Sequence, residues 1–288
     1  MSNRAALFAA IEGGSSFWSN EISTRGADEV FSRLVGGAYP DRNSALKISE
    51  RLLSIRGEEV LAEINSGGNF FITPEDVDWP LRLNDLSAIP LGLIGKGNRN
   101  YLLESAQSIS IVGTRNPTSY GGRIAGDLAA GVVDRGWAVI SGGAYGIDAA
   151  AHKGALVSEG VTIAILAGGT ERSYPAANER LFRDIEEMGL MLSEVMPKVP
   201  PVPARFLIRN RLIAALSAGT VVVEAAFRSG SLRTAREAAE IFRPVMAVPG
   251  LITSPTSEGC HRLIGERCAE LITCAADIFE LVMPLTSK

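Results

Sequence analysis

Three glycine-rich turns carry the residues best suited to bind a charged ligand. They hold Gly113, Thr114 and Arg115 in the first turn, Ser141, Gly142 and Gly143 in the second, and Gly168 and Gly169 in the third. Glycine lets backbone N–H groups approach a phosphate closely, a helix N-terminus favours negative charge, and a guanidinium binds phosphate oxygens in pairs. The first turn leads into a helix start at Tyr120, Gly121 and Gly122. Each turn by itself is also compatible with a tight strand-to-helix connection without a ligand.

A cluster of arginines strengthens the prediction of an anionic ligand. Residues 205–243 contain seven arginines against three glutamates. The candidate ligand-binding residues of this region are Arg209 and Arg211 in one predicted helix, and Ser229, Gly230, Ser231, Thr234 and Arg236 at the start of the next. Arg209 and Arg211 can also pair with Glu194 or Glu224 inside the fold, and we expect one of the two to be structural. So many phosphate-binding turns suit a polymer better than a mononucleotide.

Residues for catalysis or metal binding are few. His152 follows Asp148 by four residues and could be oriented by it as a general base, although packing at a helix start explains the pair more simply. Glu194 and Glu224 are expected to hold arginines and loop N–H groups rather than to hydrolyse a substrate. The three cysteines lack a C-x-x-C spacing, and neither G-x-G-x-x-G nor the P-loop pattern occurs. We therefore expect no enzyme activity, no cofactor and no metal.

The elements that must position these residues form a repeated pattern from residue 108 onward. Seven short apolar runs alternate with glycine turns and helical segments: SISIVGT, WAVISGG, TIAILAGG, LMLSEV, TVVVEA, PVMAVPG and ELITCA. Uninterrupted apolar strands with helical crossovers are typical of a sheet covered on both faces. This pattern predicts an α/β fold with a doubly wound, mostly parallel sheet, whose strand order stays open. Ligands of such sheets bind beyond the carboxyl ends of the strands, where the glycine turns lie.

The first hundred residues have a different pattern. The segment 43–64 begins with an N-cap residue, Asn43 or Ser44, and places Leu46, Leu53, Val60 and Ile64 at helical spacing. We expect a small helical domain over residues 1–66 and a connector over 67–107, in which LGLIGKG is a candidate strand at the edge of the sheet. The sheet domain then occupies residues 108–288.

Composition limits the class of protein. The chain of 288 residues is 46% hydrophobic, with a formal net charge of −4. Residues 1–105 contain 10 basic and 14 acidic side chains, whereas residues 106–288 contain 18 of each, so the acidity lies in the N-terminal third. No apolar run is long enough for a membrane span or a secretory signal, and we expect a cytoplasmic protein without a membrane partner.

Eight motifs in order, over roughly residues 70–275, resemble the DNA-processing protein family DprA, also called Smf. They are FFITPEDVDWPLRLNDL, GTRNPTSYG, SGGAYGIDAAAHKGAL, TIAILAGGTERSYPAANERL, LSEVMP, FLIRNRLIAALSAGTVVVEAAFRSGSLRTAREA, MAVPG and GCHRLIGERCAELI. The resemblance implies an extended Rossmann-like domain that binds single-stranded DNA and loads the recombinase RecA in natural transformation (competence) and homologous recombination. It also implies a homodimer, and no C-terminal winged-helix domain is expected after the sheet.

The resemblance implies a DNA pocket that includes Arg115, Arg180 and Arg236, helped by the backbone of the second and third glycine turns. The sequence departs from the family at Tyr145 and Glu179, where relatives carry basic residues, and at Arg233, where they carry an apolar one. The alternative is a nucleotide-binding sensor or a phosphoribohydrolase-like enzyme of a related Rossmann-like group. Its P-G-G-x-G-T-x-x-E segment is matched only in its glycines by LAGGTERSYP.

Overall fold

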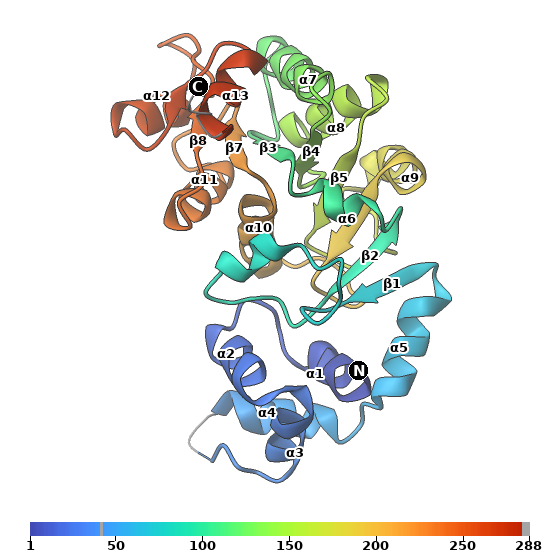
Figure 1. The fold of residues 1–288 in the computed structure, drawn as a ribbon. Helices are drawn as coiled ribbons and strands as arrows, with labels where there is room; N and C mark the ends of the chain where they lie inside the picture. The colour runs from blue at the N-terminus through green and yellow to red at the C-terminus, as the bar shows by residue number, and fades with distance from the viewer. Residues whose placement is uncertain (41–42, 284–288) are drawn as a thin grey trace, which may run out of the picture.

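The computed structural model describes residues 1–40 and 43–283, and its centre is one nine-stranded sheet (Figure 1). In chain order the strands are β1 (Asn69–Ile72), β2 (Leu93–Gly97), β3 (Ser108–Val112), β4 (Ala138–Ser141), β5 (Thr162–Leu166), β6 (Leu190–Ser193), β7 (Gly219–Val222), β8 (Val245–Ala247) and β9 (Glu270–Leu271). Their order across the sheet is β1-β2-β6-β5-β4-β3-β7-β8-β9. The pairs β1–β2 and β2–β6 are antiparallel and the other pairs are parallel.

This sheet confirms the predicted α/β fold. The seven apolar runs form β3 to β9, all parallel, and LGLIGKG supplies β2 at the antiparallel edge. The strand β1 was predicted only as part of the connector. The chain crosses from β6 to β7 past β5, β4 and β3. Strands distant in sequence, such as β3 and β7, therefore lie side by side, as do the adjacent strands β3 and β4.

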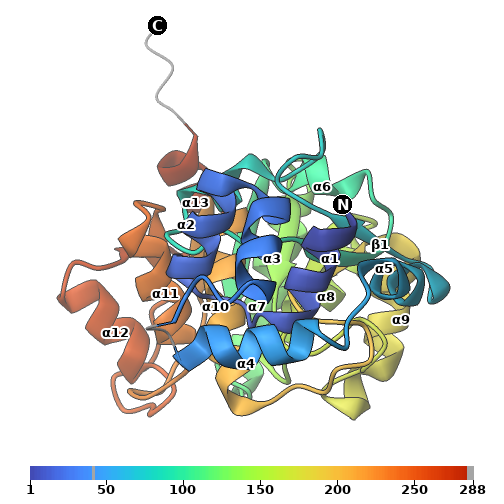
Figure 2. The ribbon, with the colours of Figure 1, turned by 90° about the horizontal axis from the view of Figure 1, so that it is seen from below.

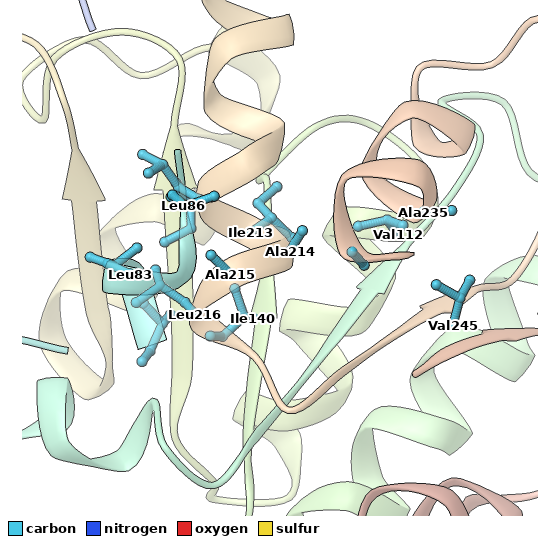
Figure 3. Close-up of a cluster of buried hydrophobic side chains, with 14 of the residues drawn as sticks. Leu83, Leu86, Val112, Ile140, Ile213, Ala214, Ala215, Leu216, Ala235 and Val245 are labelled. Carbon is cyan, nitrogen blue, oxygen red and sulfur yellow. The ribbon is translucent and has the colours of Figure 1, made fainter. Parts of the chain in front are cut away.

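Helices cover both faces of the sheet. The helices that follow β1 are η1 (Leu81–Asp85), α6 (Tyr101–Glu104), α7 (Ser119–Val133), α8 (Ile147–Val157), η2 (Ala176–Asn178), α9 (Glu179–Met188), α10 (Pro203–Leu216), α11 (Ser231–Glu240), α12 (Glu258–Gly265) and α13 (Ala275–Val282). Helices α10 and α11 pack on Val112 and Ile140 on one face (Figure 3). Helices α7, α8 and α13 pack on Ile109 and Ile111 on the other. Side chains alternate between the faces of a strand, which explains why the runs are apolar throughout.

The N-terminal helices form a separate hydrophobic cluster. They are α1 (Ser2–Ala10), α2 (Ser16–Arg25), α3 (Ala27–Val35), α4 (Asn43–Leu52) and α5 (Gly57–Ser66). They group at one end of the molecule in Figure 1, and Figure 2 views the molecule from that end. The cluster also includes Leu91 and Ile94, so the helices pack against the antiparallel edge of the sheet.

The predicted helical segment 43–64 is two helices rather than one. The chain leaves the helix after Leu52 and starts again at Gly57, and Leu46 and Leu53 are exposed rather than buried. Ala45, Ile48 and Leu52 supply the buried face of α4 instead. The break resets the helical phase, so spacing counted from Leu46 does not continue into α5. The helix-to-strand change falls between Ser66 and Asn69, and the domain division at that point stays a prediction.

Over residues 1–40 and 43–283, no helix is both long and apolar enough to cross a membrane.

Candidate functional site

A cavity of about 250 Å³ lies beyond the carboxyl ends of β3 and β4, between the turns that follow them and helices α10 and α11. We call it the central pocket. Seven predicted site residues line it: Gly113, Arg115, Arg209, Ser229, Gly230, Ser231 and Thr234. Phe206, Asn210 and Asp148 are among the residues that complete the lining. The position agrees with the rule that doubly wound sheets bind ligands at the carboxyl ends of their strands.

Arg115 presents an exposed cation at this pocket. Its guanidinium carbon lies 5.2 Å from the ring centroid of Phe206, and Tyr174 packs edge-on against the same ring, with centroids 5.4 Å apart. Among the described residues Arg115 forms no salt bridge, although its charge acts on the buried carboxylate of Asp148. An aromatic face attracts a cation without occupying its N–H donors, so these donors stay available for an anion.

Arg209 supplies a second, buried cation. One of its Nη atoms donates to the Gly142 carbonyl at 2.7 Å and to the Ile165 carbonyl, and its Nε has no partner among the described residues. Burial lowers the pKa of this guanidinium to about 10, which still leaves it charged at neutral pH. Burial has the opposite effect on an acid and raises the pKa of Asp148. The Asp148 carboxylate accepts hydrogen bonds from the N–H groups of Gly142 and Ala144.

The start of α11 forms the opposite wall of the central pocket. The hydroxyl oxygens of Ser229 and Ser231 lie 2.7 Å apart, and the Asn210 amide donates to the Gly230 carbonyl. Gly230 precedes α11 and supplies no side-chain cap. The Ser231 N–H donates to the Ser229 hydroxyl at 3.4 Å and the Leu232 N–H to the Ser229 carbonyl at 3.2 Å. This wall therefore offers an anion the helix dipole and the serine hydroxyls rather than free N–H groups.

The start of α7, in contrast, is not available to a ligand. The Glu224 carboxylate accepts from the Thr118 N–H at 2.9 Å and from the Thr118 hydroxyl at 2.6 Å. A Cβ at Gly121 would lie 2.3 Å from this carboxylate. The predicted phosphate site at this helix start is therefore filled by an internal anion, and the expectation that Glu224 holds loop N–H groups is confirmed.

Arg211 is the structural member of the Arg209 and Arg211 pair. Its Nη2 lies 2.6 Å and 2.7 Å from the two Glu194 oxygens, and both side chains are largely buried. Burial raises the pKa of Glu194 against the effect of this arginine. The expectation that Glu194 holds an arginine is confirmed, and Arg211 is absent from the lining of the central pocket.

The glycines of the second and third turns are explained by packing. A Cβ would meet the Arg209 guanidinium at Gly142, the Phe182 ring at Gly143, Pro201 at Gly168 and the Met196 and Pro197 carbonyls at Gly169. The Gly142 N–H donates to Asp148 and the Gly169 N–H to the Val199 carbonyl. Ser141 donates to the Ile111 carbonyl. Because these N–H groups are engaged inside the protein, Gly142 and Gly169 are not available as phosphate donors.

The remaining predicted residues do not line the central pocket. Thr114 donates its N–H to the Glu224 carbonyl, Arg236 is exposed on α11, and Arg180 lines a separate cavity between α8 and α9. The structure explains two of the three positions at which the sequence departs from the family pattern. Glu179 pairs with Arg183 and Arg233 with Glu237, so the charge at each position is shared within its own helix, while Tyr145 is exposed.

The spacing allowed Asp148 to orient His152 as a general base, but the two side chains form no hydrogen bond, in agreement with the simpler explanation by packing. His152 is fully buried, and its Nδ1 lies 2.7 Å from the Thr162 hydroxyl. Burial lowers its pKa to about 3, so the ring is neutral. Over the part of the chain that the structure describes, no group of three metal-ligating side chains occurs. Sequence reasoning missed Phe206, although an aromatic residue three positions before Arg209 was a usable signal.

Comparison with known proteins places this geometry in a family. The family model for DNA recombination-mediator protein A matches residues 70–283. A putative DNA processing protein DprA of Mycobacterium tuberculosis is 45% identical over 267 residues, covering 89% of this chain and 67% of the relative. DprA of Bacillus subtilis is 38% identical, with 77% of this chain and 74% of the relative covered.

Solved structures agree with the sequence relatives. The crystal structure of DprA from Streptococcus pneumoniae has a TM-score of 0.76 at 35% identity and covers 83% of this chain and 82% of its own. A structure of DprA from Helicobacter pylori, described in terms of its single-stranded DNA binding mode, has a TM-score of 0.66 at 29% identity, covering 73% of this chain and 94% of its own. With its Rossmann-like sheet and a profile match over most of its length, the chain belongs to the DNA recombination-mediator protein A (DprA) family of DNA processing proteins.

Proposed function

We propose that this protein binds single-stranded DNA in the central pocket. The observation that carries the proposal is the Arg115 guanidinium, which lies on the Phe206 ring at the pocket and forms no salt bridge with a described residue. A phosphate placed between Arg115 and the start of α11 meets two sources of positive potential. The description of the Helicobacter pylori relative as a single-stranded DNA binder supports the same ligand.

Aromatic side chains beside the pocket favour a single strand over a duplex. Tyr174 is 49% exposed and packs on Phe206, which lines the pocket. Unstacked bases can lie on such rings, whereas the bases of a duplex are stacked on one another. Phosphate contacts alone would not distinguish the two, so the rings supply the selectivity in this proposal.

What the protein does with the bound strand is a proposal that rests on its membership in the family. Membership in a family of DNA processing proteins supports the proposal that the bound strand is passed to the recombinase RecA during transformation and recombination, and that two copies act as a homodimer in the cytoplasm. In this role the protein is a binding protein and not an enzyme.

The test is a salt titration of binding to a labelled single-stranded oligonucleotide by fluorescence anisotropy. We expect affinity to fall steeply with salt, and Arg115→Ala to weaken binding and to make the log–log slope shallower by about 0.7, the value for one lost contact to a single strand. Arg135→Ala is the matched control, because Arg135 is also stacked on a phenylalanine, Phe279, but lies at the other end of α7.

Unchanged binding by Arg115→Ala at every salt concentration would show that the central pocket is not the DNA site. Displacement of the oligonucleotide by micromolar ATP would favour the nucleotide-sensor alternative instead. The RecA role is tested separately, by measuring single-strand-dependent ATP hydrolysis by RecA with and without the protein. If a preparation that binds DNA does not accelerate ATP hydrolysis by RecA, the RecA role is contradicted but DNA binding is not.

A further inference from the structure

A cavity of about 190 Å³ lies where the N-terminal helices α1 and α2 meet the chain segments that follow β1 and precede β2. We call it the seam cavity. Its lining residues are Arg4 of α1, Ser19, Ile22 and Ser23 of α2, Pro74 and Glu75 after β1, and Ile89, Pro90 and Leu91 before β2. None of them lines the central pocket, so the seam cavity is a separate feature of the molecule.

Arg4 places a buried cation in the seam cavity. The residue is 7% exposed, one Nη atom donates to the Leu91 carbonyl at 3.0 Å, and the other pairs with the Glu75 carboxylate. Burial lowers the pKa of the Arg4 guanidinium, and the charge of Glu75 opposes this effect. The carboxylates of Asp28 and Asp76 act in the same direction as Glu75 but more weakly. A guanidinium this deeply buried needs an anion beside it.

The carboxylate that fills this place belongs to an exposed side chain. The Glu75 side chain is 63% exposed, and Arg4 is its one hydrogen-bond or ion-pair partner among the described residues. The pair of Arg211 and Glu194 differs, because only 8% and 10% of those side chains are exposed. Water reaches Glu75 whether or not it is paired, so its exchange for the carboxylate of another molecule costs little desolvation.

The rest of the lining supplies a hydroxyl and an apolar wall. Ser19 is 7% exposed, and its hydroxyl forms no hydrogen bond with any residue that the structure describes. A buried hydroxyl without a partner is uncommon in proteins, so a ligand oxygen gains a hydrogen bond at this position. Ile22 and Leu91 are buried and Ile89 is half-buried in the same lining.

The size of the seam cavity limits the ligand to about one amino-acid residue. Its 190 Å³ is smaller than the pockets of drug-sized ligands, which measure about 300–1,000 Å³. The cation and the apolar wall must therefore be met by groups that lie close together. A C-terminal residue with an apolar side chain carries its carboxylate and this side chain on the same Cα. An internal aspartate or glutamate has the carboxylate but lacks the apolar group.

We propose that the seam cavity binds the C-terminal residue of a peptide that ends in an apolar side chain. The terminal carboxylate replaces Glu75 beside Arg4 and accepts a hydrogen bond from the Ser19 hydroxyl. The apolar side chain packs against Ile22 and Leu91. The seam cavity is thus a site for a protein partner, and it is independent of DNA binding in the central pocket.

The test is fluorescence anisotropy with a labelled peptide that ends in leucine, titrated with the full chain as the free acid and as the C-terminal amide. We expect the free acid to bind at least about tenfold more tightly, the effect of one hydrogen bond to a charged group. Glu75→Gln removes the internal competitor and is expected to strengthen binding of the free acid by about tenfold. Ser19→Ala is expected to weaken it by about fivefold through one lost hydrogen bond.

Glu50→Gln is the matched control, because it removes an exposed carboxylate of α4 that does not line the seam cavity. It is expected to leave peptide binding unchanged. Equal binding of the acid and the amide would contradict the proposal, and so would no binding of the acid by either the parent or Glu75→Gln. Parent-like binding of the acid by Ser19→Ala would exclude the predicted orientation of the carboxylate.

Thermal unfolding and DNA binding complete the test. A much lower thermal midpoint for Glu75→Gln than for Glu50→Gln would show that Glu75 is a fixed structural partner of Arg4, which contradicts the exchange. Binding of the labelled single-stranded oligonucleotide is expected to be the same in the parent and in all three variants. A failure of the seam cavity to bind the peptide therefore leaves the proposed DNA site untouched.

Discussion

Arg115 and Arg209 of the central pocket differ in what surrounds each guanidinium. Arg115 is exposed and lies on an aromatic ring, so its donors remain free. Arg209 is buried, and its donors meet the carbonyl ends of two strands at Gly142 and Ile165. A buried guanidinium holds the strand ends in place, while an exposed one can exchange water for a ligand. We therefore expect Arg115 to determine affinity and Arg209 to determine the shape of the site.

The buried His152 gives the protein a pH-dependent stability. Burial lowers its pKa from 6.5 to about 3, so between these values the unfolded chain binds a proton that the folded protein does not. Stability from this residue is full above pH 6.5 and is lost as the pH falls. Between pH 7 and pH 5 the expected loss is about 2 kcal/mol in the free energy of unfolding.

The variant His152→Leu isolates this effect. It removes the titrating ring, and the Thr162 hydroxyl keeps its own hydrogen bond to the Val139 carbonyl. Chemical denaturation of parent and variant at pH 7 and pH 5 gives the difference in unfolding free energy, in which the other titrating groups cancel. An equal pH dependence in the two proteins would contradict the low pKa of His152.

At the scale of elements, the start of α7 shows how a carboxylate replaces a ligand. Glu224 lies just after β7 and reaches the start of α7, the helix that follows the neighbouring strand β3. It can do so because β3 and β7 pair in the sheet. A negative charge at this place stabilises the helix and fixes the turn that carries Arg115. The loop therefore has a set conformation before any ligand binds.

Two adjacent glycines of α7 test this arrangement. A Cβ at Gly121 would lie 2.3 Å from the Glu224 carboxylate, whereas a Cβ at Gly122 meets nothing within 4 Å. Gly121→Ala is expected to lower the thermal midpoint. Gly122→Ala is expected to raise the free energy of unfolding by about 0.5–1 kcal/mol, because alanine restricts the unfolded chain and favours the helix. Equal effects of the two substitutions in thermal unfolding would contradict the position of Glu224.

Helix α10 contributes to three parts of the molecule from neighbouring positions. Arg205 lies 2.6 Å from Glu12 of the N-terminal region, Phe206 contacts Arg115, Arg209 lies under the central pocket and Arg211 pairs with Glu194. Arg205 and Arg209, four positions apart, lie on the same side of the helix, whereas Arg211 points to another side. The helix thus joins the N-terminal helices to the candidate site through its own rigidity.

At the scale of the whole molecule, the N-terminal helices and the sheet share one strand. Leu93 and Ile94 are neighbours in β2, and both are fully buried, but Leu93 belongs to the cluster under α10 and Ile94 to the cluster of the N-terminal helices. The two side chains point to opposite faces of the sheet. The packing of the N-terminal helices consequently depends on a strand of the sheet.

Substitution of these two neighbours separates the two clusters. Ile94→Ala is expected to cost about 2–5 kcal/mol through lost packing. Because the cavity opens toward the N-terminal cluster, amide hydrogen exchange should accelerate mainly in α1 to α5. Leu93→Ala is the matched control, with faster exchange expected in the sheet and α10. The same exchange pattern in both variants would contradict the assignment of Ile94 to the N-terminal cluster.

Sequence by itself determined the parallel strands and the resemblance to the family, and it predicted a site at the carboxyl ends of these strands. The apolar runs predicted β3 to β9 because both faces of a parallel sheet are covered, and the turns after them hold Gly113, Arg115 and Gly230 of the central pocket. Only the tertiary structure decided which charges are free. Arg211 and Glu194 pair with each other and Glu224 binds the N–H and hydroxyl groups of Thr118, whereas Arg115 forms no salt bridge with a described residue. Spacing along the chain does not give the distance between strands that crossovers bring together, so a cation in the sequence cannot be assigned to a ligand or to a carboxylate until the sheet order is known.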